Sequence, residues 1–110
     1  MSNLSSINKA DISDFEKRVY LALLKVPKGQ VVTYGALAKL AGFPGAARAV
    51  GSAMNKNPFA PSVACHRVVR SDGSVGEFAY GTKRKIAMLR KEGVRIEKER
   101  ITDFKEIKIA

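Results

Sequence analysis

The chain has 110 residues, enough for one domain with one modest core and too few for a second globular unit. Its apolar content of 45% is ordinary for a globular fold, and residues such as Lys25, Pro27 and Gly42 interrupt the apolar runs well short of a membrane span. Residues 1–6 are polar and lack the apolar stretch of a secretory signal. We therefore expect an intracellular, cytoplasmic protein (nucleoid-associated in a prokaryote) with no membrane partner.

The charge of the chain is its first functional signal. Lys and Arg number 20 against 10 Asp and Glu, a formal net charge of +10. Such an excess favours a polyanionic partner, with nucleic acid ahead of an anionic membrane, although it can also serve solubility alone. The cations are scattered and form no long Lys tract, which suits a folded DNA-binding domain better than a disordered arm.

The first part of the chain predicts a polar lead-in followed by a helix. Residues 1–12 are the lead-in, and Ser13 with Glu16 forms a capping box at the start of a helix over 14–25. Apolar residues recur there at helical spacing, at Phe15, Val19, Ala22, Leu23 and Val26. Pro27 and Gly29 end the helix, and a short strand is predicted at 30–32.

Two short helices come next, and their spacing is typical of a helix-turn-helix. The first runs over 34–41 after Thr33 as N-cap, and the second over 46–55, with a Pro- and Gly-containing turn between them. The residues predicted to face the core are Leu37, Ala38, Leu40, Ala49, Val50, Ala53 and Met54. Many helical proteins contain such pairs, and the positive charge strengthens the interpretation.

The remaining elements are shorter. Two prolines make residues 57–61 a rigid, non-helical loop, and a strand at 68–70, a turn at 71–74 and a loop at 75–81 follow. Thr82 is predicted to cap a last helix that ends at Gly93 and turns Ile86, Met88 and Leu89 inward. Residues 95–110 are predicted to be a tail packed along the body. The fold class expected is mainly α: a single helix-turn-helix, winged-helix-like domain over 1–110 with a short β element near Cys65.

The densest chemical cluster is Cys65, His66 and Arg67, which joins the only cysteine to the only histidine and a cation. An imidazole or a positive charge beside a thiol lowers its pKa and favours the reactive thiolate. Adjacency alone nevertheless favours an inert small hydrophobe beside a surface histidine. One Cys and one His cannot supply the ligands of a structural zinc site, so no metal is expected.

Several segments in order resemble one family. PSVACHRVV at 61–69 resembles the active-site signature Pro-Cys-His-Arg-Val of the O6-alkylguanine-DNA alkyltransferases. VTYGALA at 32–38 resembles the family's first helix-turn-helix segment, and AARAVG at 46–51 its recognition helix. Asn57-Pro58 is similar to its hinge, while GEFAYG at 76–81, Lys85 and LRKEG at 89–93 are similar to its loop and final helix. The resemblance runs from about residue 14 to 94.

The resemblance implies a role for each matched residue in catalysis. Cys65 would accept the alkyl group, and His66 would draw the thiol proton, through a water, toward Glu92. Asn57 would brace the recognition helix against the active-site loop. Without the resemblance, Glu92 would be interpreted as a solvated carboxylate at a helix end.

A second group of residues would contact DNA. Tyr34 would press on the phosphate beside the target nucleotide, and Arg48 would fill the gap left in the base stack; Thr33, Ala46 and Arg67 are the further DNA-binding residues expected. The target carbon cannot be reached inside the duplex, so the nucleotide must be rotated out. The family docks in the minor groove, and the small residues between 45 and 51 permit that close approach.

The function implied is direct reversal of DNA damage in a single turnover. The product thioether is stable, so a monomer without a cofactor would act once on double-stranded DNA containing O6-alkylguanine. Two departures from the family pattern matter: Ala64 replaces the usual Pro before the cysteine, and Ala79 stands where relatives often carry a Ser that holds the base or leaving group. The resemblance does not extend to the N-terminal domain of many relatives, and we expect a shorter member of the family.

Three alternatives remain. An alkyltransferase-like lesion sensor would bind damaged guanine without accepting the group, but such relatives replace the acceptor cysteine, which is present here as Cys65. A winged-helix transcription regulator would need neither Cys65 nor His66. A thiol hydrolase would turn over repeatedly, and Glu92 is the one residue visible that could orient its base.

Overall fold

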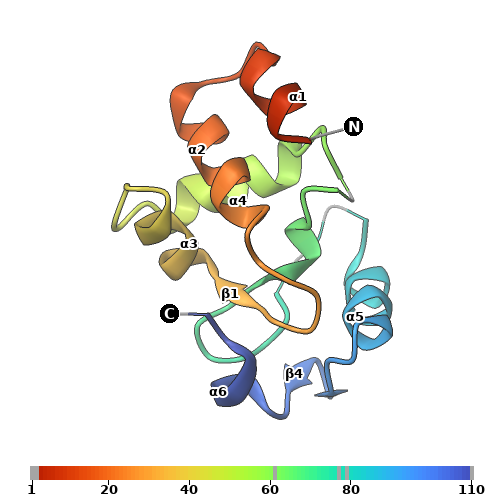
Figure 1. Cartoon of the computed structure of the whole chain (residues 1–110). Coiled ribbons are helices and arrows are strands. Elements are labelled where there is room, and N and C mark those ends of the chain that lie inside the picture. The colour runs from red at the N-terminus through yellow and green to blue at the C-terminus, as the bar shows by residue number, and fades with distance from the viewer. Residues whose placement is uncertain (1–2, 61, 77, 79, 110) are drawn as a thin grey trace.

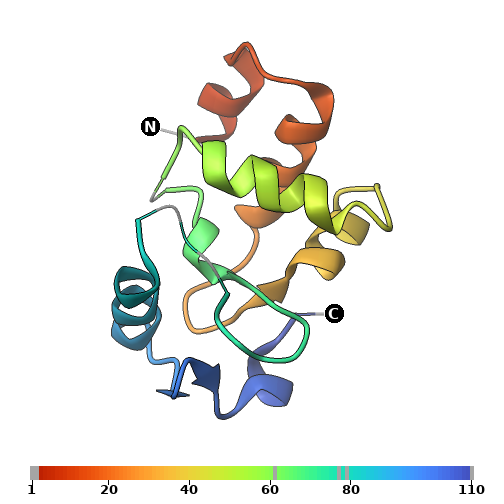
Figure 2. The same cartoon turned by 180° about the vertical axis from the view of Figure 1, so that it is seen from behind.

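The computed structural model describes residues 3–60, 62–76, 78 and 80–109 (Figure 1). Its elements in chain order are α1 (Asn3–Lys9), α2 (Asp14–Leu23), β1 (Val32–Thr33), α3 (Tyr34–Leu40), α4 (Ala47–Lys56), the 3-10 helix η1 (Cys65–Arg67), β2 (Val68–Val69), α5 (Thr82–Lys91), β3 (Ile96–Glu97), β4 (Arg100–Ile101) and α6 (Phe104–Ile107). Figures 1 and 2 show α1 to α4 at one end, α5 and α6 at the other, and η1 between them. The predicted mainly α class is confirmed.

Helix α2 begins as predicted. The Ser13 hydroxyl accepts a hydrogen bond from the Glu16 N–H at 3.1 Å, and the Glu16 carboxylate accepts one from the Ser13 N–H at 3.1 Å, which completes the capping box. The preceding segment is more ordered than a polar lead-in, because α1 occupies much of it. The Ile7 side chain of α1 is fully buried against the core, and this single apolar anchor carries too little periodicity to predict a helix.

Helices α3 and α4 form the predicted pair. Thr33 caps α3 by accepting a hydrogen bond from the Ala36 N–H at 3.1 Å. Two expected core residues point outward instead: Leu40 is 51% exposed and Ala49 is also exposed. At 100° per residue the buried stripe of α3 runs through Leu37, Ala38 and Ala41, and that of α4 through Val50, Ala53 and Met54. Leu40 and Ala49 lie outside these stripes.

A short parallel strand pair connects the helix pair to the middle of the chain. Val32 pairs with Val68 and Thr33 with Val69. The observed β1 begins two residues later and ends one residue later than the strand predicted at 30–32, and Val31 instead bridges to Lys108. Because β1 leads directly into α3 and β2 follows η1 directly, this pairing places the start of the helix pair beside Cys65.

Helix α5 has a different start from the one predicted. Thr82 is its first residue, and the N-cap is Gly81 with a φ of 95°, a conformation that glycine adopts without strain. No side chain caps this end. Leu89 is buried as predicted, whereas Ile86 and Met88 are only partly buried, and the fully buried position on this face is Lys85.

The C-terminal tail packs on the body, as expected, through structure of its own. β3 and β4 form an antiparallel hairpin whose turn residues, Lys98 and Glu99, have φ values of 49° and 63°. Such turns favour Asn and Gly, so a Lys-Glu turn gives no recognisable sequence signal. The tail is also held by a hydrogen bond from the Ile109 N–H to the Val31 carbonyl at 2.8 Å.

Two apolar clusters stabilise the described chain. The larger lies among α1 to α4, β1 and η1, and the smaller joins α5, β3 and β4 around Leu89, Ile96 and Ile101. None of the helices described is both long and apolar enough to cross a bilayer. In the larger cluster the Tyr20 hydroxyl is buried and donates to the Ala53 carbonyl at 2.7 Å, and burial raises the pKa of Tyr20 to about 12.

Replacing Tyr20 with Phe tests this link between α2 and α4. Tyr20→Phe keeps the ring but removes the hydroxyl that donates to the Ala53 carbonyl. We therefore expect the free energy of unfolding to fall by about 1–2 kcal/mol. The midpoint of thermal unfolding should fall by several degrees. Tyr80→Phe is the matched control. Because Tyr80 is 58% exposed, this substitution should leave the midpoint unchanged. Equal midpoints for all three proteins would contradict the assigned hydrogen bond.

Candidate functional site

The centre of the site is Cys65, the first residue of η1. Its thiol is free and its side chain lies below the surface, 4% exposed. The preceding loop is held close to it by two backbone hydrogen bonds: the Cys65 N–H donates to the Val63 carbonyl and the Arg67 N–H to the Ala64 carbonyl, both at 2.9 Å. The lone thiol is therefore held on a short, tightly turned segment.

A polar network lies directly behind the thiol. His66 Nε2 is 2.9 Å from Glu92 Oε2, at the C-terminal end of α5. Arg67 donates to both oxygens of the same carboxylate, from Nε at 3.0 Å and from Nη2 at 2.7 Å. Its third donor, Nη1, reaches the Val26 carbonyl at 2.7 Å. The three side chains thus join η1 to the end of α5 and to the segment after α2.

The charge of Glu92 orients the imidazole of His66. Burial on its own would raise the pKa of Glu92, but the hydrogen bonds from Arg67 and His66 outweigh it, and the pKa lies below its ordinary value of 4.5. An ionised carboxylate only accepts, so His66 Nε2 carries the proton in this contact. His66 Nδ1 is buried and has no hydrogen-bond partner among the described residues. Its lone pair is therefore a buried acceptor that no described donor reaches.

Asn57 holds the loop between α4 and η1. It is the C-cap of α4 and is 8% exposed. Its Nδ2 donates to the Val63 carbonyl at 2.8 Å, and its Oδ1 accepts from the Phe59 N–H at 2.9 Å. One amide side chain therefore fixes both ends of the turn that leads to Cys65, the position in which the sequence predicts a bracing residue.

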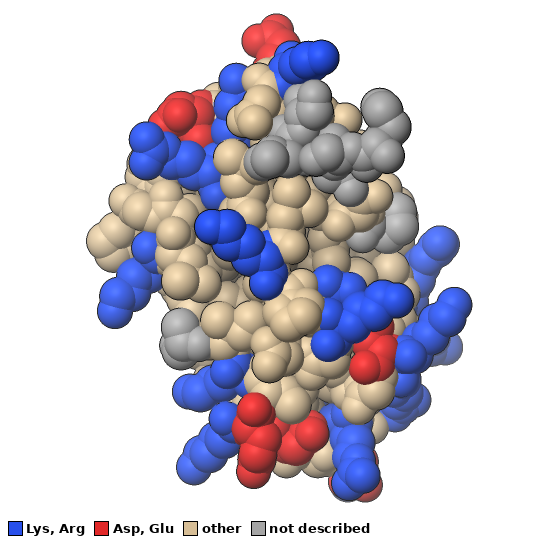
Figure 3. All heavy atoms as spheres, in the orientation of Figure 1, with Lys and Arg blue, Asp and Glu red and all other residues tan. Residues whose placement is uncertain are grey.

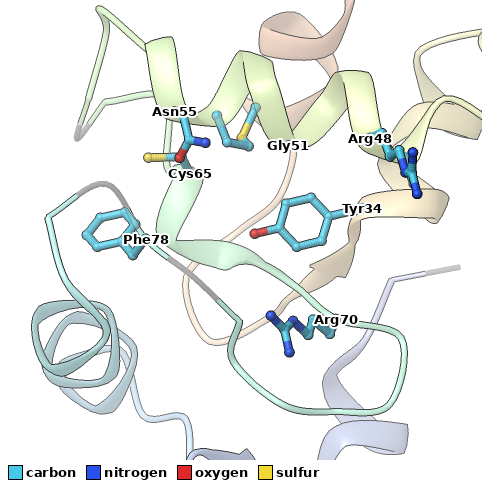
Figure 4. A pocket seen from close by; sticks show the side chains of 9 residues that line it. Tyr34, Arg48, Gly51, Asn55, Cys65, Arg70 and Phe78 are labelled. Atoms are coloured by element: carbon cyan, nitrogen blue, oxygen red, sulfur yellow. The ribbon is translucent and has the colours of Figure 1, made fainter.

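Cys65 opens into a pocket of ≈ 300 Å³ between α4 and the loop after β2. Figure 4 shows the Tyr34 hydroxyl directed into the middle of this pocket, with Cys65 and Phe78 at one end and Arg48 at the other. Arg70 forms part of the wall, and Gly76 allows it to lie there, because a Cβ on Gly76 would be 3.2 Å from Arg70 Cγ. The pocket combines an aromatic floor, two cations and a thiol.

A second hollow of ≈ 270 Å³ also reaches Cys65, from the side of α5. Phe78 lines both spaces and so forms the wall between them. The second hollow is lined in addition by His66, Tyr80, Arg84 and Met88. The sulfur therefore lies where two cavities of similar size meet.

Lys85 is a functional candidate that the sequence did not identify beyond its place in a motif. It is fully buried, and its ammonium donates to the Val68 carbonyl at 2.7 Å and lies 5.8 Å from the centre of the Tyr34 ring. Burial lowers its pKa to about 8, and the neighbouring Cys65 acts in the opposite direction. Its partner is 17 residues away in the chain, so no local pattern predicts this burial.

The other predicted DNA-binding residues divide into two groups. Thr33 and Ala46 are partly exposed at the starts of α3 and α4, beside the first pocket. The placement of Arg67 argues against its predicted contact with DNA, because its guanidinium is directed inward to Glu92 and Val26. Ala79, Glu77 and Pro61 lie outside the described residues. Arg70 and Arg84 line the two cavities and were not singled out from the sequence; Arg70 is the last residue of the strand predicted at 68–70 and directly follows the observed β2.

One face of the molecule is rich in Lys and Arg. Figure 3 shows Lys and Arg spread over one face, with many along the side where α5 lies. Within the part of the chain that the structure describes, no three His, Cys, Asp or Glu side chains are grouped so that they could hold a metal ion. The described site combines a recessed thiol, an imidazole held by a carboxylate and two lining cations, Arg48 and Arg70.

Comparison with known proteins gives a family match over most of the chain. The family described as 6-O-methylguanine DNA methyltransferase, DNA binding domain, matches residues 14–94. The chain is 44% identical over 80 residues to the methylated-DNA–protein-cysteine methyltransferase of Mycobacterium leprae, covering 73% of this chain and 48% of that protein. It is 48% identical over 79 residues to that of Salmonella typhimurium, covering 72% and 46%. The chain spans about half the length of these curated relatives.

Solved structures give two kinds of similarity. Mycobacterium tuberculosis OGT in complex with DNA matches with a TM-score of 0.72 and 46% identity, covering 74% of this chain and 50% of that one. S. pombe Atl1, in complex with damaged DNA containing O6-carboxymethylguanine, matches with a TM-score of 0.81 and 32% identity, covering 92% and 99%. The second similarity extends over nearly the whole of both chains.

The Glu92 network makes a pH-dependent contribution to stability. Glu92→Gln should lower the free energy of unfolding at neutral pH by about 2 kcal/mol, because it removes the charge that Arg67 and His66 bind. The folded-state pKa of Glu92 is depressed, so this stability is present above the unfolded value of 4.5 and is lost as the pH falls through the folded-state pKa. The difference between wild type and Glu92→Gln should therefore shrink in acid.

Urea unfolding at about pH 7 and about pH 3 measures this difference. Glu97→Gln, which neutralises an exposed carboxylate in β3, is the control and should match wild type at both values. A Glu92→Gln deficit that is equally large in acid would mean that the amide disturbs packing instead of removing a charge.

Proposed function

Because the chain belongs to the 6-O-methylguanine DNA methyltransferase family, we propose that it repairs DNA by transferring an alkyl group from O6 of guanine to the sulfur of Cys65. The observation that carries this proposal is the position of the lone thiol, recessed in a pocket with His66 and Glu92 behind it. The family match supplies the reaction class. The relatives that match over 79 and 80 residues carry the name methylated-DNA–protein-cysteine methyltransferase.

The network provides a route for the thiol proton. Glu92 holds the proton of His66 on Nε2, so Nδ1 accepts the proton of Cys65 through an intervening water. The thiolate attacks the alkyl carbon, the sulfur–carbon bond forms and the bond from carbon to O6 breaks. The electron pair leaves with the guanine, which takes up a proton. The Tyr34 hydroxyl is directed into the pocket and donates a hydrogen bond to the departing base.

The helix pair and the charge account for binding to the duplex. The net charge of +10 provides a sequence-independent attraction to phosphates. Arg48 on α4, at the pocket end opposite Cys65, fills the stack when the nucleotide is rotated into the pocket, and Tyr34 presses on its phosphate. A Cβ on Gly35 or Gly51 would meet nothing within 4 Å, so these glycines leave the surface low where a minor groove would approach.

The remaining parts of the proposal concern context. Residues 1–110 act as one domain and as a monomer, in a single turnover and without a cofactor. The substrate is genomic DNA, so the place of action is the compartment that holds it, the cytoplasm in a prokaryote. Because position 79 is Ala, which has no side-chain donor, Tyr34 and the cations of the pocket shield the leaving base.

Lesion binding without transfer is the second candidate function. It is favoured by the similarity to S. pombe Atl1, which extends over 92% of this chain and 99% of that one and which was solved with damaged DNA. The presence of Cys65, followed in the chain by a His66 that Glu92 orients, argues against binding alone. Binding alone requires neither a thiol nor a proton acceptor, so transfer accounts for more of the site.

Intact-mass measurement after incubation with an oligonucleotide duplex containing O6-methylguanine decides between the two functions. We expect the chain to gain the mass of one methyl group, located on the Cys65 peptide, with one equivalent of product per protein. Cys65→Ser should gain none, because a hydroxyl is far less nucleophilic, yet should bind undamaged duplex as wild type does. Tight binding of the lesion by wild type without any mass gain would instead establish the lesion-binding function.

The assigned role of Arg48 predicts a dependence on the substrate. Arg48→Ala should slow transfer from duplex DNA about tenfold more than transfer from free O6-methylguanine base, because only the duplex requires extrusion of a nucleotide. Arg95→Ala, which removes an exposed cation away from the pocket, should slow neither. Equal losses on both substrates would mean that Arg48 acts on the pocket or on the fold.

A further inference from the structure

The second hollow beside Cys65 has no role in the transfer of a methyl group. A methyl carbon bonded to the sulfur occupies only the immediate contact position, and the guanine enters from the first pocket, where Tyr34 and Arg48 lie. A space of ≈ 270 Å³ nevertheless continues from the same sulfur toward α5. In an in-line displacement the remaining atoms of a longer adduct lie to the side of the line from the sulfur through the reacting carbon to O6, and this hollow is a described space beside the sulfur.

Arg84 gives the hollow its chemical character. It stands on the first turn of α5 with its guanidinium 5.7 Å from the centre of the Tyr80 ring, an arrangement that holds a cation over an aromatic face. The stacked guanidinium makes no hydrogen bond or ion pair with another described side chain, and no carboxylate is among the described residues that line the hollow. Its positive charge is therefore unneutralised by the described walls.

We propose that this hollow receives the distal part of the adduct and that Arg84 selects adducts ending in an anionic group, such as carboxymethyl, over neutral ones. This inference rests on the proposed function and deepens it. A planar guanidinium matches a carboxylate with two parallel hydrogen bonds, and the Arg84 guanidinium lies over the Tyr80 ring at the wall of the hollow. Arg84 is thus a specificity-determining residue that contacts the adduct beyond the reacting carbon.

The transfer of such an adduct balances in the same way as transfer of a methyl group. The Cys65 thiolate attacks the methylene carbon, the sulfur–carbon bond forms and the carbon–O6 bond breaks. The thiol proton passes through a water to Nδ1 of His66. The guanine leaves with the electron pair and takes up a proton. The product is S-carboxymethylcysteine, whose carboxylate stays in the hollow beside Arg84.

The first test is competition between duplexes that carry O6-carboxymethylguanine and O6-methylguanine, with the two products separated by intact mass. Arg84→Gln should lower the carboxymethyl-to-methyl ratio about fivefold, the effect of a moderately exposed ion pair, while the methyl rate stays close to that of wild type. Lys83→Gln is the matched control: it removes the same charge from the neighbouring exposed position of α5, which does not line the hollow. An unchanged ratio in Arg84→Gln overturns the inference.

The second test needs no DNA, because Cys65 is the only thiol of the chain. Iodoacetate and iodoacetamide both alkylate a thiolate with loss of iodide, and they differ in the charge of the group delivered. The ratio of their rates, divided by the same ratio for the urea-unfolded protein, should be about fivefold lower in Arg84→Gln than in wild type and unchanged in Lys83→Gln. Equal ratios in all three proteins overturn the inference.

The two tests separate the failure of this inference from the failure of the proposed function. If neither duplex transfers its adduct, the proposed function fails, and the iodoacetate ratio still decides whether Arg84 favours anions beside Cys65. If both adducts are transferred and Arg84→Gln leaves the preference intact, the proposed function stands and the role of Arg84 is wrong.

Discussion

The ion pair between Arg67 and Glu92 is the contact on which the arrangement of the site depends. Arg67 donates hydrogen bonds to the Glu92 carboxylate and to the Val26 carbonyl, which are 25 and 41 residues away in the chain. One side chain therefore holds η1, the end of α5 and the segment after α2 together. The same carboxylate accepts from His66, so the contact that fixes the backbone also fixes the imidazole beside Cys65. The group that holds the structure together is thus also the one in the proposed route for the proton.

A second constraint couples the surface proposed to meet DNA to this network. The β1–β2 pairing is only two residues long, yet it joins the residues just before Tyr34 to those just after Arg67. Helices α3 and α4 then pack against each other and against α2, which carries the Tyr20 hydrogen bond to α4. The pocket is thus bounded by elements whose relative positions are set from both sides, and a rotated nucleotide would enter a site that is already formed.

How far the sequence predicts this structure depends on how local each interaction is. Helix α2 was predicted because its capping box spans four consecutive residues, and the importance of Cys65 and His66 because they are adjacent and unique. Glu92 could be assigned only through the family resemblance, since its contact with His66 crosses 26 residues. The burial of Lys85, the hairpin at β3–β4 and the cavity beside Arg84 depend on packing between distant segments, and no periodicity or motif reports them.

The burial of Cys65 affects how readily air oxidises the protein to a disulfide-linked dimer. A disulfide requires two sulfurs about 2 Å apart, and a side chain that is only 4% exposed cannot bring its sulfur that close to the sulfur of a second copy. The folded chain, with a single cysteine, therefore resists oxidative dimerisation even at high concentration. Covalent dimers on a non-reducing gel would accordingly measure the fraction of molecules that have opened around η1.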